Sequence, residues 1–122
     1  MKFSEDYAIG TNVIRAFTDT TIEVNNVPYN RSLIVGNNLL LDDWGISHID
    51  EMTLQNWQTL LEYKPEVILI GTGKSLLFPH PSSYACAIEA GVGVEFMDSA
   101  AACRTYNVLV SEDRSVIAGI II

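Results

Sequence analysis

The sequence GVGVEFMDSAAACRTYN occupies residues 91–107 and contains the pattern that decides the fold. Its first part is apolar except for Glu95, as in a buried strand. Asp98 then stands directly before a run of small residues, where a helix N-cap is expected. A strand followed at once by a helix is the repeating unit of a parallel α/β sheet. This stretch therefore predicts an α/β fold and marks the edge of the sheet where polar residues gather.

The segments around this stretch extend the alternation of strand and helix. Residues 67–70 form a continuous apolar run, which indicates a central strand covered on both faces. Residues 116–122 are expected to form a last buried strand, after a helix that runs from Asp98 to about Val110. The order strand, helix, strand, helix, strand favours a largely parallel sheet with right-handed crossovers. Because the last run is uniformly apolar, an exposed position in it would be able to pair with another chain.

Two further helices are expected before residue 91. Apolar residues at helical spacing predict a helix over residues 52–61, with Asp50 or Thr53 as its cap. Pro81 is expected to open a second helix, which Gly91 would end in the left-handed conformation.

The N-terminal part of the chain has the pattern of antiparallel strands. Residues 12–41 contain short β-branched and aromatic runs separated by turn residues, which favours an antiparallel meander with one solvent-exposed face. Asn25 and Asn26 suit a tight hairpin turn because asparagine tolerates positive φ. We therefore expect a single domain over residues 1–122 with a three-layer α/β fold. It would have a mixed central sheet with helices packed on it, plus an N-terminal antiparallel β-meander.

Composition limits the classes of partner. The chain has 122 residues, with 48% apolar and only 18% charged residues, as in a globular domain. It carries 15 Asp and Glu against 7 Lys and Arg, for a net charge of −8. Because an acidic surface repels phosphate backbones and anionic lipids, neither a nucleic acid nor a membrane surface is expected as a partner.

The location of the protein is predicted from two targeting patterns that the sequence lacks. Residues 1–20 lack the basic and apolar regions of a signal peptide, and the tail at 116–122 is too short to span a bilayer. A cytoplasmic location is therefore expected by default.

Cys86 and Cys103 form no CxxC pair, and two thiols alone cannot close a zinc site. They are expected to be free, buried thiols.

The run Gly71-Thr72-Gly73-Lys74-Ser75 ends like a phosphate-binding P-loop. The motif also needs a glycine where this chain has Ile68, inside the expected strand, and no helix pattern follows Ser75. A nucleoside triphosphatase is therefore rejected. The two glycines still permit a close backbone approach, either to a ligand or to a neighbouring strand.

The roles of Asp98 and Arg104 each have two possible interpretations. Asp98 is expected to cap its helix, and a carboxylate in that position competes with any anion at the helix start. Arg104 is expected either to pair with Glu95 or to bind a ligand. Tyr106 is expected to pack its ring and direct its hydroxyl to a polar partner.

No residue set in the sequence points to catalysis or to a cofactor. His48 and His80 are the only histidines, and neither has a second ligand at metal spacing. We therefore assign no metal, no cofactor and no catalytic residue.

Two segments together resemble a known family. They are PEVILIGTG at residues 65–73 and GVGVEFMDSAAACRTYN at residues 91–107, followed by the C-terminal Val/Ile/Ala strand. The family is small and of unknown biochemical activity, and it includes a mitochondrial respiratory complex I assembly factor and an adipogenesis-associated human protein. The resemblance implies a compact three-layer α/β fold and a non-enzymatic assembly or interaction role for at least one relative. The family's glycine pair corresponds to Gly71 and Gly73, and its Arg-Thr-Tyr-Asn run to residues 104–107.

Two hypotheses for the function follow. The first is a cytoplasmic interaction or assembly-type protein without catalysis of its own, either a monomer or a weak homo-oligomer, with a possible protein partner. The alternative is a binder of a small anionic ligand, or an enzyme, with its site at the carboxyl ends of the parallel strands. The candidate pocket residues are Gly71, Thr72, Gly73, Glu95, Asp98, Arg104 and Tyr106.

Overall fold

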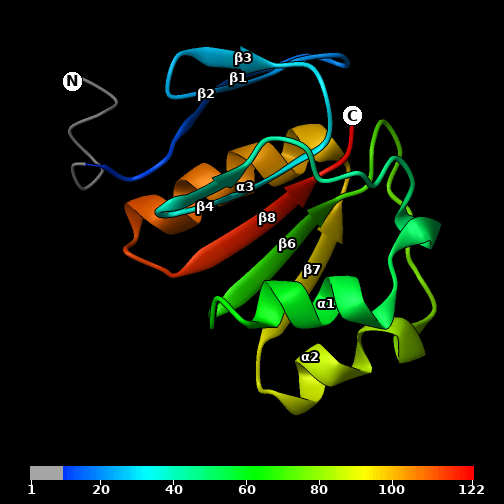
Figure 1. The fold of residues 1–122 in the computed structure, drawn as a ribbon. Coiled ribbons are helices and arrows are strands. Elements are labelled where there is room, and N and C mark those ends of the chain that lie inside the picture. Colours follow the sequence, from blue (N-terminus) through cyan, green and yellow to red (C-terminus); the bar gives the residue numbers. More distant parts are fainter. Residues whose placement is uncertain (1–9) are drawn as a thin grey trace.

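The computed structural model describes residues 10–122 and has a mixed five-stranded sheet as its central layer (Figure 1). Helices α1 (Leu54–Leu61) and α2 (Ala85–Glu89) cover one face of this sheet, and helix α3 (Ser99–Ser111) covers the other. A separate three-stranded sheet lies over α3. The expected fold class is confirmed: a mixed central sheet between helices, with an N-terminal antiparallel meander. The expected absence of a signal sequence concerns residues 1–20, of which 1–9 lie outside the described residues.

The meander consists of β1 (Ile14–Phe17), β2 (Ile22–Val24) and β3 (Val27–Tyr29), paired in that order and antiparallel. Asn25 and Asn26 join β2 to β3 with φ angles of 52° and 72°, as a tight hairpin turn requires. The meander is shorter than the sequence predicts, because the residues after β3 leave it.

Strands β4 (Leu33–Gly36) and β5 (Leu39–Leu41) belong to the central sheet instead. Strand β4 is buried along its whole length, so it needs covering on both faces. It pairs antiparallel with β8 (Val116–Ile120), which the pattern of residues 31–41 alone does not predict.

The order of the central sheet is β5-β4-β8-β6-β7. Strand β6 (Val67–Gly71) runs parallel to both β8 and β7 (Gly93–Met97), as the strand–helix alternation predicts. Strand β8 lies between β4 and β6, so both of its edges are paired, and all five of its residues are buried. Strand β8 therefore has no unpaired edge at which another chain could add a strand.

Capping interactions of nearby side chains fix where the helices begin. Thr53, and not Asp50, caps α1: its Oγ1 accepts from the Asn56 amide at 3.3 Å, and Asn56 Oδ1 accepts from the Thr53 amide at 2.7 Å. The helix expected from Pro81 is divided into a 3₁₀ turn over Pro81–Tyr84 and the short α2. Gly91 has a φ of 78°, which is the left-handed conformation expected there.

The core has two halves, one on each face of the central sheet. Alternation along β6 sends Leu69 toward α3 and Ile68 toward α1. Tyr106 is fully buried in the half beneath α3 and the meander, and Trp57 is fully buried in the other half. The carboxyl ends of β6, β7 and β8 all meet the start of α3, and this meeting point positions the candidate site.

Candidate functional site

Gly71 ends strand β6 against the first residue of α3. A Cβ at this position would lie 2.8 Å from Ser99 Oγ and 2.9 Å from Ser99 Cα. Only glycine permits this approach without displacing the helix. Gly71 therefore makes its close backbone approach to the start of a helix, α3, which the sequence alone did not suggest.

Ser99 is a polar residue of this site that the sequence did not single out. Its side chain is fully buried, donates from Oγ to the Ile121 carbonyl at 2.6 Å and accepts from the Gly73 amide at 2.8 Å. The Ser99 amide donates to the Gly73 carbonyl at 2.8 Å. These bonds join the ends of three segments. A serine after a helix cap is so common that its sequence position carries no signal of this role.

Thr72 holds the loop that follows β6. Its amide donates to the Met97 carbonyl at 2.8 Å. Its Oγ1 donates to the Ser75 carbonyl at 2.6 Å and accepts from the Leu77 amide at 3.1 Å. Because its hydroxyl both donates and accepts within the loop, Thr72 fixes the path of residues 73–78.

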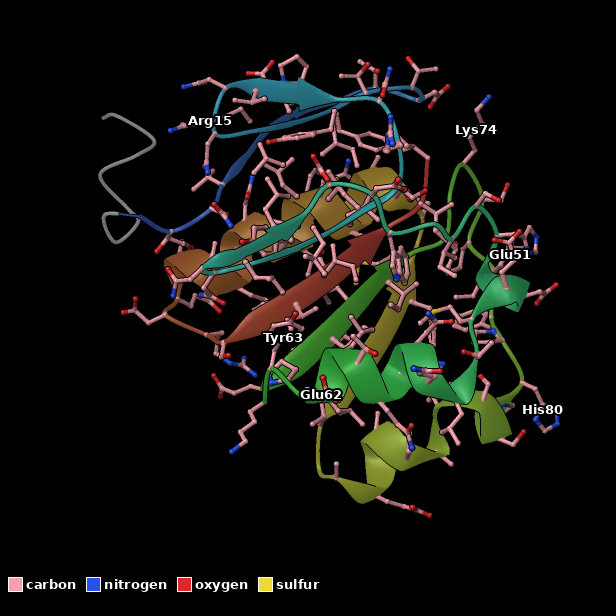
Figure 2. All side chains as sticks on the ribbon, in the orientation of Figure 1. Arg15, Glu51, Glu62, Tyr63, Lys74 and His80 are labelled. Carbon is pink, nitrogen blue, oxygen red and sulfur yellow. The ribbon has the colours of Figure 1, made fainter. Side chains whose placement is uncertain are left out.

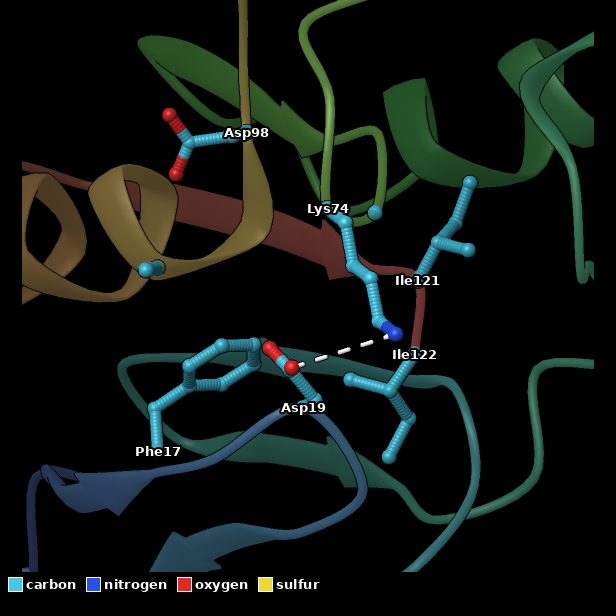
Figure 3. Close-up of a pocket in the computed structure, with 8 residues that line it drawn as sticks. Phe17, Asp19, Lys74, Asp98, Ile121 and Ile122 are labelled. Carbon is cyan, nitrogen blue, oxygen red and sulfur yellow. Dashed lines mark ion pairs between the residues drawn. The ribbon is translucent and has the colours of Figure 1, made fainter.

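A hollow of about 220 Å³, here called the strand-end pocket, opens beside this loop (Figure 3). Of the candidate residues, Gly73 and Asp98 line it. Asp98 Oδ1 accepts from the Ala101 amide at 2.9 Å, so the carboxylate caps α3 as expected. Lys74 Nζ lies 3.9 Å from Asp19 Oδ2 across the mouth of the pocket. The pocket therefore contains two carboxylates and one ammonium group.

Arg104, Glu95 and Tyr106 lie away from the strand-end pocket. Arg104 is exposed on α3 and lines a different hollow, between α3 and β1. Glu95 is exposed on the outer strand β7, and within residues 10–122 no ion pair joins it to Arg104. Tyr106 is fully buried, and its hydroxyl donates to the Asn12 carbonyl at 2.8 Å. The structure thus brings Gly73 and Asp98 together in the strand-end pocket and places Glu95, Arg104 and Tyr106 elsewhere.

Cys86 and Cys103 are both free thiols. Burial raises the pKa of Cys103 to about 12, so its thiol is neutral at physiological pH. Cys86 is half-buried. Within residues 10–122 no group of three or more His, Cys, Asp or Glu side chains is placed to hold a metal ion. Within the same residues, no helix has both the length and the apolar character needed to cross a membrane.

Residues 14–121 match the model of a family described as proteins of unknown function, DUF498/DUF598. The chain belongs to this family. The resemblance drawn from residues 65–73 and 91–107 is confirmed, because the chain matches this family of unknown function and its relatives include proteins named NADH dehydrogenase [ubiquinone] 1 alpha subcomplex assembly factor 3.

Named relatives of this DUF498/DUF598 chain come from distant organisms. The 13 kDa major membrane protein of Francisella tularensis is 38% identical over 89 residues, which are 72% of each chain. The NADH dehydrogenase [ubiquinone] 1 alpha subcomplex assembly factor 3 of Xenopus tropicalis is 31% identical over 80 residues. That match covers 64% of this chain and 44% of the assembly factor, so the chain spans less than half of that relative.

A solved structure has the same architecture as this chain. A crystal structure of a Bordetella parapertussis protein, a structural genomics target, has a TM-score of 0.86 and 32% identity to this chain. The alignment covers 93% of this chain and 98% of the Bordetella protein. The layered α/β fold is therefore common to both proteins.

Proposed function

We propose that this chain is a non-catalytic interaction or assembly-type protein, built as a single domain over residues 1–122. The observation that carries the proposal is an exposed apolar loop after β6, here called the loop patch, made of Leu76, Leu77 and Phe78. Their exposed fractions are 48%, 36% and 70%. Large apolar side chains gathered on one loop mark surfaces that other proteins cover.

The loop patch is held in place before any partner arrives. The Leu77 amide donates to Thr72 Oγ1 at 3.1 Å, which anchors the middle of the loop. The Phe78 ring packs edge-on against Phe96 of β7 with ring centroids 6.1 Å apart. Phe96 in turn packs against Tyr84 at 5.0 Å. A preorganised loop loses less conformational entropy on binding, so more of its contact energy contributes to affinity.

The expected occupant is a different protein with an apolar groove that accepts Phe78. Covering apolar surface stabilises a complex by about 25 cal/mol for each Å² removed from water. Aromatic side chains are frequent anchors of protein interfaces. The relatives named as assembly factors of the NADH dehydrogenase 1 alpha subcomplex support a partner of this kind.

A matched pair of surface variants tests this function. We expect Phe78→Glu to abolish capture of a partner that the tagged wild-type protein co-purifies and binds again from purified components. Val108→Glu is the control, because Val108 is also an exposed apolar side chain (54% against 70% for Phe78) and lies on α3, on the opposite face of the central sheet. It should retain the partner. Circular dichroism melting should show that both variants fold.

Three outcomes contradict the proposal. One is capture that survives Phe78→Glu. Another is the absence of any stable partner together with reproducible turnover of a metabolite. The third is a wild-type protein that dimerises alone in analytical ultracentrifugation and becomes monomeric with Phe78→Glu, since the loop patch would then join two copies of this chain.

A small-anion binder at the strand ends, the alternative hypothesis, has weaker support. The strand-end pocket contains two carboxylates against one ammonium group, which disfavours an anion. Of the nearby polar groups, Ser99 and Thr72 already make hydrogen bonds within the fold.

The cytoplasmic location remains a prediction, because one relative is called a membrane protein. We expect the untagged protein to stay in the supernatant after high-speed centrifugation of a cell lysate. The physical reason is the net charge of −8, which disfavours binding to anionic membrane surfaces. Recovery in the pellet after a high-salt wash would contradict this location.

A further inference from the structure

Strand β7 is the outermost strand of the central sheet, and among residues 10–122 no strand pairs with its outer side. It runs in unbroken parallel register with β6, and its Gly93 amide donates to the Glu66 carbonyl at 3.1 Å. Because alternate residues of a strand direct their backbone groups to the same side, Val94 and Phe96 direct theirs away from the sheet. These outward N–H and C=O groups, here called the β7 edge, have no hydrogen bond to any other described residue.

The other sheet edges of the described residues have features that hinder the addition of a strand. Strand β5, at the opposite end of the central sheet, has only three residues. In the meander, β3 is equally short and contains Pro28, and β1 has a register shift between Ile14 and Ala16. Short strands, proline and bulges all keep edges from pairing with other chains. Strand β7 has five residues in regular register and none of these features, so its edge is the one suited to pairing.

The two faces of β7 differ in chemistry. Val94 and Phe96 pack in the core half that α1 and α2 cover (Figure 2). The Phe78 ring of the loop patch lies on the same face, with its centroid 6.1 Å from that of Phe96. Glu95 is exposed and alternates to the opposite face, which α3 covers. A strand added at the β7 edge would therefore have one face beside the loop patch and the other beside Glu95.

Glu95 selects the charge of an added strand. If two copies of this chain paired antiparallel about this residue, two glutamates would stand directly opposite each other, which is destabilising. A Lys or Arg in the added strand would instead form a stabilising cross-strand pair with Glu95. The net charge of −8 acts in the same direction, because it attracts basic chains. Charge complementarity therefore favours a basic segment of a different protein over a second copy.

We infer that the β7 edge binds an extended segment of a partner protein, which adds a further strand to the central sheet. The segment carries Lys or Arg opposite Glu95 and apolar side chains on the face of Phe78. Its main-chain N–H and C=O groups pair with those of Val94 and Phe96, which is how strand addition provides affinity. The inference rests on the proposed interaction role, and it specifies the conformation and charge of the partner.

A capped synthetic peptide of alternating valine and lysine is the probe, and a peptide of alternating valine and glutamate is its charge-reversed control. In ¹⁵N NMR spectra of the full chain, we expect saturable binding of the valine–lysine peptide and weaker binding of the control. Hydrogen exchange of the Val94 and Phe96 amides should be rapid in the free protein. It should slow at least about tenfold in the complex, because an amide paired in a sheet exchanges only when the pairing opens. The Glu95 amide, which points toward β6, should be protected in both states.

Val94→Pro should abolish binding of the valine–lysine peptide, because proline lacks the N–H that the added strand needs. The substitution removes no hydrogen bond to β6, since the Val94 amide points outward. Val94→Thr is the matched control, because it keeps both the amide and the β-branched shape, and it should bind like the wild type. Circular dichroism melting should show that both variants fold.

Glu95→Lys tests the charge preference without changing the backbone. Because Glu95 is exposed, the variant should fold, and it provides the test by itself if Val94→Pro does not fold. We expect it to bind the valine–glutamate peptide more tightly than the valine–lysine peptide, which reverses the preference of the wild type.

Slow exchange of the Val94 amide in the free protein would overturn the inference, because the β7 edge would then already be paired. No binding of the valine–lysine peptide, or binding that leaves exchange of the outward amides unchanged, would also overturn it. So would equal affinities of Val94→Pro and Val94→Thr, or a peptide preference that Glu95→Lys does not alter. A wild-type protein that dimerises alone and becomes monomeric with Val94→Pro would assign the β7 edge to a second copy instead.

The β7 edge and the loop patch can be tested separately with the partner that the tagged wild-type protein co-purifies. We expect Val94→Pro to lose this partner, and Val94→Thr to retain it. Capture that is lost with Phe78→Glu but survives Val94→Pro would overturn strand addition and leave the loop patch in place. Capture that survives Phe78→Glu but is lost with Val94→Pro would contradict the role of the loop patch alone.

Discussion

Replacing Tyr106 with alanine should lower the free energy of unfolding by about 3–5 kcal/mol, the range for large buried aromatic side chains. Tyr106 is fully buried among the residues between α3 and the central sheet. Its removal leaves a cavity and deletes the hydrogen bond to the Asn12 carbonyl. Because domains of this kind are stable by only about 5–15 kcal/mol, much of the stability is lost. Urea denaturation followed by far-UV circular dichroism measures the change.

Two companion variants separate the structural role of Tyr106 from a ligand-binding role. Tyr106→Phe removes only the hydroxyl and should cost about 1 kcal/mol. Tyr63→Ala removes a tyrosine that is 45% exposed and should change stability much less. If Tyr106→Ala were as stable as Tyr63→Ala, the ring would not be a core element, and its proposed place in a binding pocket would gain support.

Replacing Gly71 with alanine should lower the free energy of unfolding by about 1–3 kcal/mol, the usual cost of overpacking. The new methyl group would lie 2.9 Å from the backbone Cα of Ser99 and 3.2 Å from Ala102 Cβ. Since helix α3 would have to move, the Ser99 hydrogen bonds to Gly73 and Ile121 would also weaken. Thermal and urea denaturation, with the two tryptophans as fluorescent probes, measure this loss.

Gly93→Ala is the control for Gly71→Ala, because Gly93 is also a strand glycine of the same sheet. A Cβ there meets only the Glu66 carbonyl at 3.8 Å, an ordinary contact. Its stability should stay within about 0.5 kcal/mol of the wild type. Equal losses in the two variants would mean that the general cost of alanine in a strand, and not contact with α3, explains the effect.

Most of the central architecture was predictable because each element has a strong local signal. The continuous apolar runs of β6 and β8 indicate buried strands, and Asp98 caps α3 where the pattern places a helix start. The turn at Asn25 and Asn26 follows from their tolerance of positive φ. The local signals fail at β4, whose pairing with β8 joins segments far apart in the sequence. No local pattern states which of two sheets a short apolar strand enters.

The candidate site was predictable only in part. Gly73 and Asp98 do lie together at the strand ends, because carboxyl ends of parallel strands share one edge of the sheet. Ser99 was missed because its importance depends on what α3 packs against. Arg104 lines a hollow between α3 and β1, and the sequence does not reveal that β1 of the meander lies beside α3.

The sequence by itself determined the family, the type and order of most elements, and the acidic balance, because each depends on residue identity or on spacing within a short window. The tertiary structure decided the division of the N-terminal strands between two sheets, the burial of Tyr106 and the placement of β1 beside α3. These features depend on contacts between distant segments, and packing and hydrogen bonding of the whole chain select among the arrangements that the local patterns permit.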